Sequence, residues 1–316
     1  MKKIDLETAA RLLRSGEVVA IPTETVYGLG GWIMSHSGLE KIFSTKERPF
    51  FDPLIVHIAG IEDAKKLTPN WTPVHQALAQ NCWPGPLTLI ADKGDSVDWL
   101  ITAGLASVGL RCPDHPLALE LLKKIEGGVA APSANKFGKT SPTSAEHVEE
   151  EFGDAVAILD GGPCRVGIES TVAGVKGNLV EIYRPGLYTA AMLKDILKDA
   201  GLDCEVRYAE SPVAPGQLKH HYMPKIPLVI VAPTFDWAKD QIKVENLVGK
   251  KLSRPAFWIQ PTKSEIASRE LYESLRKYDT AGHDVILTKK LPEHSSEEWM
   301  GIWNRLEKAK SGSLLK

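Results

Sequence analysis

The feature that most limits how this chain can fold is a break in its pattern at residues 208–227. The stretch YAESPVAPGQLKHHYMPKIP has four prolines and no hydrophobic periodicity. Proline lacks a backbone N–H and disrupts both helix interiors and central strands. Since 316 residues suffice for two hydrophobic cores, we predict a domain over 1–207, a linker over 208–227 and a smaller domain over 228–316.

Short apolar segments alternate with amphipathic ones before the break. Strands are predicted at EVVAI after Gly16, at 54–58, 86–91, 107–111, 128–132 and 155–159, and in a hairpin over 170–184. Helices are predicted at 5–15, 38–45, 61–67, 73–81, 115–125, 143–151 and 189–200. After the break, a strand at LVIVA precedes helices at 264–279 and 296–310. The pattern predicts an α/β or α+β fold with a twisted sheet and helices packed on it.

The charge is unevenly distributed along a chain of net charge −2. Residues 1–207 carry 21 Lys and Arg against 27 Asp and Glu, a net of −6, and residues 208–316 carry 17 against 13, a net of +4. An acidic large domain is a poor surface for a phosphate backbone. We therefore expect no stable nucleic-acid binding, and any anion to be held by a local group of cations.

Targeting signals and cysteine pairs give no sign of a secreted or membrane protein. The N-terminal segment is too charged for a signal peptide, and no apolar run approaches the ~20 residues that span a bilayer. The four cysteines are scattered without a C-x-x-C pair, which argues against a zinc site and a disulfide framework. We expect a cytoplasmic protein.

Several well-known motifs can be tested and rejected. GLGG at 28–31 lacks the third glycine of G-x-G-x-x-G, and FGKTS at 137–141 lacks the opening glycine of a P-loop because Ser133 stands there. H-E-x-x-H and G-x-S-x-G are absent from the sequence. If the chain is an enzyme, positioning and electrostatics are its expected chemistry.

Four segments combine turn-forming residues with polar side chains at the ends of predicted strands, where ligands usually bind in α/β proteins. They are PTETVYGLG (22–30), STKERPFFDPLIVHI (44–58), APSANKFGKTSPT (131–143) and GIESTV (167–172). Their hydroxyls and amides, with Lys46, Arg48, Arg111 and Arg184, suit phosphates and a carboxylate.

Each segment also has a purely structural interpretation. Lys46 and Arg48 could lie in a solvated turn, His57 could be a satisfied core histidine, and the Ser/Thr-rich stretch could consist of helix caps and turns. Arg111 is harder to dismiss, because a cation directly after a buried strand usually has an anionic partner.

The order of the motifs resembles the threonylcarbamoyl-AMP synthase family, the YrdC-type enzymes of transfer-RNA modification. The matching motifs are PTETVYGLG, K-x-R-P-x-x-x-P-L-x-x-H, W-P-G-P-L-T, R-x-P-x-H-P, A-P-S-A-N…S-P-T, E-S-T-V and R-P-G, all within 1–207. APGQLKHHYMP resembles the H-Y-x-P linker of the two-domain members, and LYESLRKYD and IWNRLEKA resemble their second domain. The resemblance covers nearly the whole chain.

This resemblance implies both a reaction and a fold. L-Threonine, bicarbonate and ATP, with Mg²⁺, would give threonylcarbamoyl-AMP, pyrophosphate and water in a nucleotidyltransferase reaction. A downstream transferase would use the product to modify adenosine in transfer RNAs that read codons beginning with A. The implied fold is a YrdC-like twisted sheet around a deep cavity, with a Rossmann-like second domain.

The resemblance also implies site residues. Lys46 and Arg48 would be catalytic, pointing from a turn to hold ATP phosphates. The L-threonine pocket would be formed by Thr25, His57, Arg111, Ala131 and Ser170. The nucleotide would be bound by Lys46, Arg48, Asp52, Ser107, Ser133, Ser141, Arg184 and Tyr222, with Tyr222 closing over the site from the linker as a lid.

One position departs from the family. Members resemble each other in having Asn where this chain has Asp52. A carboxylate repels a polyphosphate unless Mg²⁺ or an arginine lies between them, so we expect Asp52 to approach the metal or to face away.

Two rival functions remain open at this stage. The chain could be an RNA-binding module, which a steep salt dependence of RNA affinity would indicate. It could also be a carbamoyl transferase for another acceptor, which the amino-acid dependence of pyrophosphate release would separate from the synthase.

Overall fold

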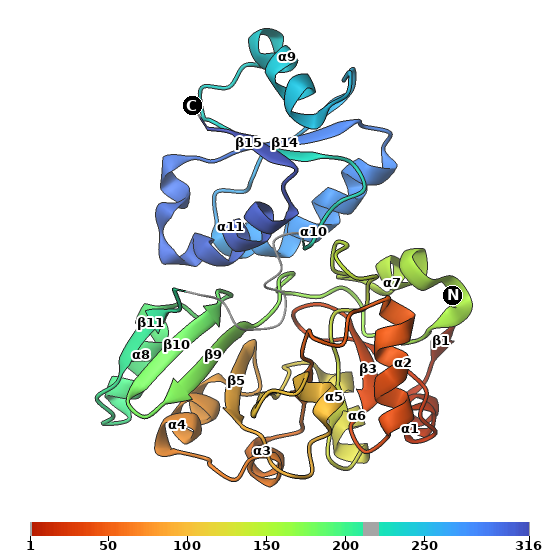
Figure 1. The fold of residues 1–316 in the computed structure, drawn as a ribbon, viewed down its shortest axis with the longest axis vertical. Helices are drawn as coiled ribbons and strands as arrows, with labels where there is room; N and C mark the ends of the chain where they lie inside the picture. The colour runs from red at the N-terminus through yellow and green to blue at the C-terminus, as the bar shows by residue number, and fades with distance from the viewer. Residues whose placement is uncertain (1, 211–220, 316) are drawn as a thin grey trace. The chain divides into compact units, whose positions relative to one another are not determined.

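The computed structural model describes residues 2–210 and 221–315, which form two compact units (Figure 1). The first unit contains the described residues before Gly138 and from Ser141 to Glu210. The second contains Gly138–Thr140 and the residues from His221 onward. The predicted linker 208–227 lies partly outside the described residues.

The first unit is built on a mixed sheet of 11 strands among the described residues. In spatial order these are β1 (Lys3–Ile4), β8 (Ala157–Leu159), β2 (Val19–Ile21), β3 (Gly28–Trp32), β7 (Val129–Ala130), β4 (Ile55–His57), β6 (Ser107–Arg111), β5 (Leu87–Asp92), β9 (Thr171–Lys176), β10 (Leu179–Arg184) and β11 (Glu205–Tyr208). The predicted hairpin is present as the antiparallel pair β9–β10.

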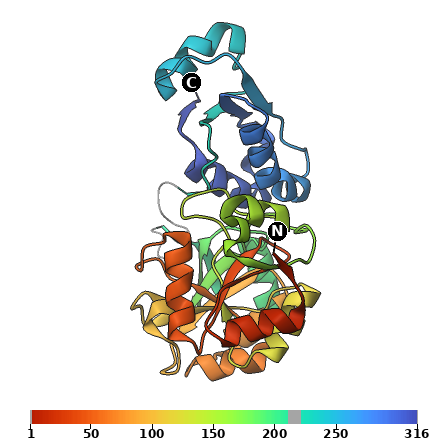
Figure 2. The same cartoon turned by 90° about the vertical axis from the view of Figure 1, so that its right-hand side faces the viewer.

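Helices cover the sheet, and local caps define where several of them begin. They are α1 (Leu6–Arg14), α2 (His36–Lys46), α3 (Ile61–Leu67), α4 (Pro73–Cys82), α5 (Trp99–Thr102), α6 (Pro116–Lys124), α7 (Ala145–Phe152) and α8 (Ala190–Asp199), with a 3₁₀ turn at Gly153–Ala155. The Asp5 carboxylate accepts the Thr8 N–H at 2.8 Å at the start of α1 and so caps the helix. Figure 2 shows these helices from the side.

Alternate residues of the central strands enter different hydrophobic cores. In β2, Ala20 belongs to the core that also holds residues of α2 and α5, whereas Val19 and Ile21 belong to the core with α1 and α6. Since successive side chains of a strand point to opposite faces, the sheet separates these two cores. A third core joins α4 and α8 to strands β5, β9 and β10.

The second unit is a parallel sheet with helices, consistent with a Rossmann-like domain. Its strands lie in the order β13 (Pro255–Trp258), β14 (Val285–Lys289), β12 (Leu228–Val231) and β15 (Gly312–Leu314). Its helices are α9 (Trp237–Val248), α10 (Ser264–Thr280) and α11 (Glu297–Ala309), with a 3₁₀ turn at Pro292–Ser295. All four residues of β12 are buried, as expected for a strand covered on both faces.

A short segment from the middle of the first unit's sequence folds with the second unit. The Met223 N–H donates to the Gly138 carbonyl at 2.8 Å, and the Arg276 guanidinium donates to the Thr140 carbonyl at 2.5 Å. Lys139 and Met223 form an isolated parallel bridge. No local sequence pattern predicted that residues 138–140 fold with the second unit.

The predicted fold class is confirmed, but two local expectations were wrong. The glycine-rich segment at 28–32, for which no strand was predicted, is the interior strand β3. Its glycines allow a close approach to α2, since a Cβ on Gly31 would lie 2.9 Å from the Gly38 carbonyl. Lys46 ends helix α2, whereas we had placed it in a turn. The turn begins at Glu47, whose φ of 54° is left-handed.

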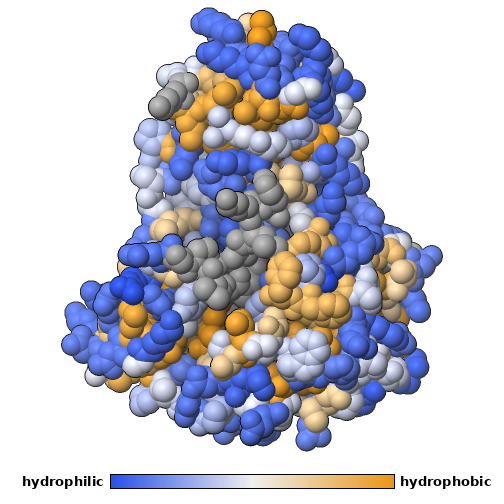
Figure 3. Space-filling model, viewed as in Figure 1, coloured by the Kyte–Doolittle hydropathy of each residue, from blue (hydrophilic) through white to orange (hydrophobic). Residues whose placement is uncertain are grey.

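The surface carries both polar and apolar side chains. On the face in Figure 3 hydrophilic residues predominate, with apolar areas between them. Among the described residues, none of the helices combines the length and apolarity needed to cross a bilayer.

Candidate active site

The turn after β2 fixes the direction of three polar side chains. The Thr23 hydroxyl donates to the Val26 carbonyl at 2.6 Å, lies 2.9 Å from the Thr25 hydroxyl, and accepts the N–H groups of Thr25 and Val26 at 3.2 Å. The carbonyl of Glu24 accepts the Val166 N–H at 2.8 Å. These contacts hold the Glu24 side chain between two anchored neighbours.

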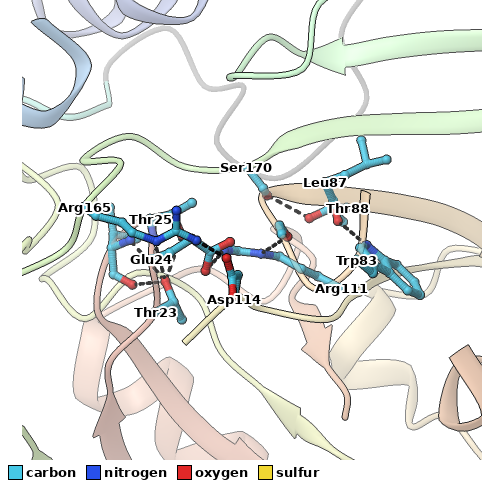
Figure 4. A network of polar contacts seen from close by, with 12 residues as sticks. Thr23, Glu24, Thr25, Trp83, Leu87, Thr88, Arg111, Asp114, Arg165 and Ser170 are labelled. Atoms are coloured by element: carbon cyan, nitrogen blue, oxygen red, sulfur yellow. Dashed lines mark hydrogen bonds and ion pairs between the residues drawn. The ribbon is translucent and has the colours of Figure 1, made fainter. Parts of the chain in front are cut away.

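The Glu24 carboxylate lies against Arg111, the last residue of β6. One Glu24 oxygen is 2.7 Å from an Arg111 guanidinium nitrogen, and both side chains are almost entirely buried (Figure 4). These two atoms form an ion pair, but their geometry does not meet the criteria of a hydrogen bond. Arg111 Nε donates to the Gly85 carbonyl at 3.4 Å, which orients the guanidinium from the side of the W-P-G-P-L-T motif. The predicted anionic partner of Arg111 is therefore Glu24.

His57 stands beside Arg111 because strands β4 and β6 pair in register there. The two residues are direct partners in the parallel ladder, so their side chains leave the same face of the sheet. Burial, with repulsion from Arg111, lowers the pKa of His57 to about 3. The imidazole is neutral near pH 7 and can hydrogen-bond a hydroxyl group. Its Nδ1 is buried without a hydrogen bond to the described residues.

Ser170 and Arg184 meet where the hairpin β9–β10 begins and ends. Arg184 donates to the Ser170 carbonyl at 3.0 Å and to its hydroxyl at 3.1 Å, and that hydroxyl lies 2.7 Å from the Thr88 hydroxyl of β5. Figure 4 shows the Thr88–Ser170 pair near Arg111. A Cβ on Gly186 would collide with the Thr171 N–H, so the R-P-G motif keeps this corner tight.

The Lys46 ammonium supports the loop after β7. It donates to the Ser133 carbonyl at 2.5 Å and to the Asn135 carbonyl. Ser133 also bridges to Gly28 of β3, and the Ala131 N–H donates to the Ile55 carbonyl at 3.0 Å. Burial, with repulsion from Arg48, holds the pKa of Lys46 well below its usual range.

Arg48 is paired with Asp52, the position at which this chain differs from the Asn of the family that it resembles. Arg48 Nη2 lies 2.8 Å from an Asp52 oxygen and 3.0 Å from the Pro53 carbonyl, while Arg48 Nε donates to the Asp52 carbonyl at 3.2 Å. Both side chains are buried. An arginine thus lies against the carboxylate, one of the two ways in which Asp52 could stand near a polyphosphate.

Two other predicted residues lie in different surroundings. Ser107 begins β6 and Arg111 ends it, so they stand about 13 Å apart along the strand at ~3.3 Å per residue. Ser107 lines a separate cavity of about 1000 Å³ with residues such as Trp71 and Glu181. Tyr222 is buried within the second unit, where its ring lies 5.7 Å from the Tyr272 ring and 4.1 Å from that of His221.

Sequence reasoning missed three residues of this region: Glu24, Thr88 and Glu169. The Ser141 hydroxyl donates to the Glu169 carboxylate at 2.6 Å. Glu24 and Glu169 lay within motifs that we had already quoted, PTETVYGLG and GIESTV. Their burial could not be read from the sequence, because acidic residues are mostly exposed.

Comparison with known proteins assigns both parts of the chain. Residues 11–186 match the Sua5, YciO and YrdC family model described as telomere recombination, and residues 188–311 match the C-terminal domain model of threonylcarbamoyl-AMP synthase. The threonylcarbamoyl-AMP synthase of Pyrococcus abyssi is 36% identical, covering 98% of this chain and 95% of its own. That of Bacillus subtilis is 37% identical, covering 98% and 93%.

A solved structure is similar in sequence and fold. The crystal structure of Pyrococcus abyssi Sua5 complexed with L-threonine superposes with a TM-score of 0.84 at 32% identity, covering 99% of this chain and 98% of that one. The matches cover nearly the whole length of the chain. The chain belongs to the threonylcarbamoyl-AMP synthase family.

Proposed function

We propose that the chain makes threonylcarbamoyl-AMP and pyrophosphate from L-threonine, bicarbonate and ATP. The observation that carries this proposal is a group of buried polar side chains at strand ends, with Arg111, His57 and Ser170 near Glu24. This group lies in a chain that resembles synthases along nearly its whole length. The synthase structure solved with L-threonine supports the same substrate here.

At one end of the site, Arg111 would receive the carboxylate of threonine. A guanidinium matches two carboxylate oxygens with parallel hydrogen bonds, and Arg111 is held on a rigid strand beside His57. The neutral His57, with Thr25 and Ser170, would recognise the threonine hydroxyl, and the backbone at Ala131 would complete the pocket. A substrate without that hydroxyl would leave these buried groups without a partner.

At the other end, Lys46, Arg48 and Arg184 would serve the nucleotide. The loop with Ser133 and Ser141 would contact ATP, and Lys46 keeps that loop in place through its two carbonyl contacts. Arg48 would turn from Asp52 toward the phosphates. Asp52 would then be near the polyphosphate. Ser107 would contact the nucleotide only if it left the separate cavity that it now lines.

Mg²⁺ would enter the site bound to the phosphates of ATP. Within the part of the chain that the structure describes, no three His, Cys, Asp or Glu side chains form a metal-binding group. Mg²⁺ bound to ATP phosphates neutralises their charge and stabilises the leaving pyrophosphate. Asp52 is the carboxylate that could approach it, since its Arg48 partner is the cation expected to move.

The chemistry needs no covalent enzyme intermediate. The threonine amine would attack bicarbonate, forming an N–C bond and releasing water, and a carbamate oxygen would then attack the α-phosphorus as pyrophosphate leaves. The reaction is a nucleotidyl transfer. Orienting the reactants can lower the barrier by up to ~7–11 kcal/mol, and fixed cations stabilise charge on the α-phosphate.

Tyr222 would act as a lid that excludes water. The H-Y pair at 221–222 occurs once in the sequence and lies directly after residues outside the described part. Tyr222 has a positive φ of 64°, which few non-glycine residues adopt. A lid would protect the carbamate and the mixed anhydride from hydrolysis.

The product would be passed on in the cytoplasm. A mixed carbamic–phosphoric anhydride is short-lived in water, so a downstream transferase that modifies transfer RNA would consume it. The net charge of −6 over residues 1–207 disfavours direct RNA binding by this domain.

The test is pyrophosphate release from ATP, Mg²⁺ and bicarbonate, with and without L-threonine, and with L-serine as the control. Threonine-dependent release, with threonylcarbamoyl-AMP found by mass spectrometry, is the expected result. Release with another amino acid or with none would favour transfer to a different acceptor. No release from folded protein would overturn the proposal and lead to RNA titrations at two salt concentrations.

A further inference from the structure

Glu24 is the one fully buried carboxylate of the site region to which the proposed function gives no task. Its side chain has no exposed surface, and neither of its oxygens accepts a hydrogen bond from the described residues. Its only described ionic contact is Arg111, at 2.7 Å. The touching nitrogen, Nη2, likewise donates no hydrogen bond within the described part of the chain.

This arrangement is costly if it serves only the fold. Buried carboxylates normally accept several hydrogen bonds, and a buried ion pair without them recovers little of the free energy of dehydration. Two other buried carboxylates near the site lie among more hydrogen bonds. Asp52 and Arg48 add two bonds from Arg48 to backbone carbonyls, and Glu169 accepts a hydrogen bond from Ser141. The Glu24–Arg111 pair therefore has hydrogen-bonding capacity left for a ligand.

The two charges match the two ends of an amino acid. A free α-amino acid at neutral pH is a zwitterion whose carboxylate and ammonium are separated by one carbon. Arg111 offers donors to the carboxylate, and Glu24, 2.7 Å away, offers acceptors to the ammonium. A neutral zwitterion adds no net charge to a buried site, whereas a lone anion or cation would leave one partner uncompensated.

We propose that Glu24 binds the α-ammonium group of L-threonine while Arg111 binds the carboxylate. This inference rests on the proposed function, because it concerns the amino-acid end of the same site. Glu24 then places the nitrogen and accepts the proton that the ammonium must lose, so that the resulting amine can attack bicarbonate and release water. Thr23 holds Glu24 in position through the turn, since its hydroxyl contacts the Thr25 hydroxyl, donates to the Val26 carbonyl and accepts the Thr25 N–H.

The proposal is tested by pairing variants with ligands that each lack one charge. Binding to the full-length protein is measured by calorimetry for L-threonine, for 3-hydroxybutyrate, which lacks the ammonium, and for L-threoninol, which lacks the carboxylate. The variants are Glu24→Gln and Arg111→Lys. Asp114→Asn is the matched control, because Asp114 forms the neighbouring but exposed ion pair with Arg165.

We expect Glu24→Gln to weaken L-threonine and L-threoninol at least about tenfold, as for a lost charged hydrogen bond, and to leave 3-hydroxybutyrate unchanged or tighter. Arg111→Lys should weaken L-threonine and 3-hydroxybutyrate but not L-threoninol. Asp114→Asn should bind all three as the wild type does. ATP affinity, measured in the same way, should be unchanged in Glu24→Gln.

Two results would overturn the proposal. One is equal weakening of L-threonine and 3-hydroxybutyrate in Glu24→Gln, which indicates a structural role. The other is unchanged threonine affinity in a folded Glu24→Gln protein. If Glu24→Gln fails to fold, Glu24→Asp keeps the charge with a shorter reach and should weaken L-threonine more than 3-hydroxybutyrate, with equal effects again overturning the proposal.

The same measurements separate this inference from the proposed function. Wild-type protein that binds L-threonine but releases no pyrophosphate would overturn the function and leave the binding comparison intact. Threonine-dependent release with no ligand discrimination between wild type and Glu24→Gln would overturn the inference alone.

Discussion

The two ends of the candidate site differ in how many hydrogen bonds their charged side chains already make within the protein. At the amino-acid end, Glu24 and Arg111 form an ion pair, but both Glu24 oxygens and Arg111 Nη2 make no hydrogen bond to the described residues. At the phosphate end, Lys46 is bonded to two carbonyls and Arg48 to Asp52 and Pro53.

This difference predicts different responses to ligands. Threonine would add hydrogen bonds at its end without breaking any, so that end is preorganised for binding. A phosphate would have to replace protein oxygens that Lys46 and Arg48 now contact. ATP should therefore bind with a local rearrangement.

The largest effect is expected from Arg111→Ala. Loss of the carboxylate partner should lower kcat/KM for threonine at least about a hundredfold, the size expected for removing a buried charged contact. It should also destabilise the first unit by about 3–5 kcal/mol, because Glu24 keeps a buried charge without a partner.

Arg165→Ala is the matched control for Arg111→Ala. It breaks the exposed pair with Asp114 and should cost less than about 1 kcal/mol. Urea unfolding and pyrophosphate release measure both variants. Equal effects of the two substitutions would contradict the distinction between a buried ligand-binding pair and a surface pair.

A smaller effect is expected at the phosphate end. Lys46→Ala and Arg48→Ala should each lower turnover at least about tenfold, as for removed stabilisation of transition-state charge, while the protein stays folded. The loss should appear with ATP as the varied substrate and leave threonine binding in calorimetry unchanged.

Lys41→Ala serves as the control for the lysine variant. Lys41 lies on the same helix α2 but is exposed and pairs with Glu17 at 2.6 Å. Its substitution should leave turnover unchanged. Near-wild-type rates for both Lys46→Ala and Arg48→Ala would remove them from the proposed site.

Tyr222→Ala should increase the fraction of the intermediate that is hydrolysed more than it lowers the rate of pyrophosphate release. Without the ring, water would reach the intermediate, and the ratio of threonylcarbamoyl-AMP to pyrophosphate should fall severalfold. Tyr278→Phe, on α10, is the control. An unchanged ratio in folded Tyr222→Ala protein would argue against a lid.

The last prediction concerns stability and not turnover: the free energy of unfolding should depend on pH. The pKa of His57 is lowered from 6.5 to about 3, so the unfolded chain binds more protons than the folded one between these values. The free energy of unfolding should therefore fall by up to a few kcal/mol as the pH drops from 6.5 toward 3. His57→Gln should flatten this loss in urea titrations.

His36 gives a control of opposite sign. Its hydrogen bond to Asp98 raises the pKa, so its contribution is present below 6.5 and lost as the pH rises through the folded value. His36→Gln should leave the acid-side slope in place. A slope that His57→Gln does not change would show that other groups cause it.

The order of strands and helices was largely readable from the sequence, because hydrophobic periodicity reflects burial. The predicted segments 61–67 and 107–111 coincide with α3 and β6. The strand at 28–32 was not predicted, since glycines there permit a close approach to α2 and carry no strand signal of their own.

The sequence predicted that some polar residues lie close together, but it did not predict which of them pair. The motifs at the strand ends predicted that His57 and Arg111 lie close together, and the two residues are partners in the β4–β6 ladder. The partner of Arg111 could not be deduced, because Glu24 is 87 positions away in a sequence whose long-range pairing no local pattern encodes. Whether Lys46 faces a ligand or a carbonyl likewise depends on tertiary contacts.

The excursion of Gly138–Thr140 into the second unit has a consequence for limited proteolysis. The chain passes between the units three times, at 137–138, at 140–141 and through the linker. A single cut after Glu210 would therefore not yield two fragments that each contain all of one unit. The short segment would stay covalently attached to the N-terminal fragment while its hydrogen-bond partners, Met223 and Arg276, belong to the C-terminal one.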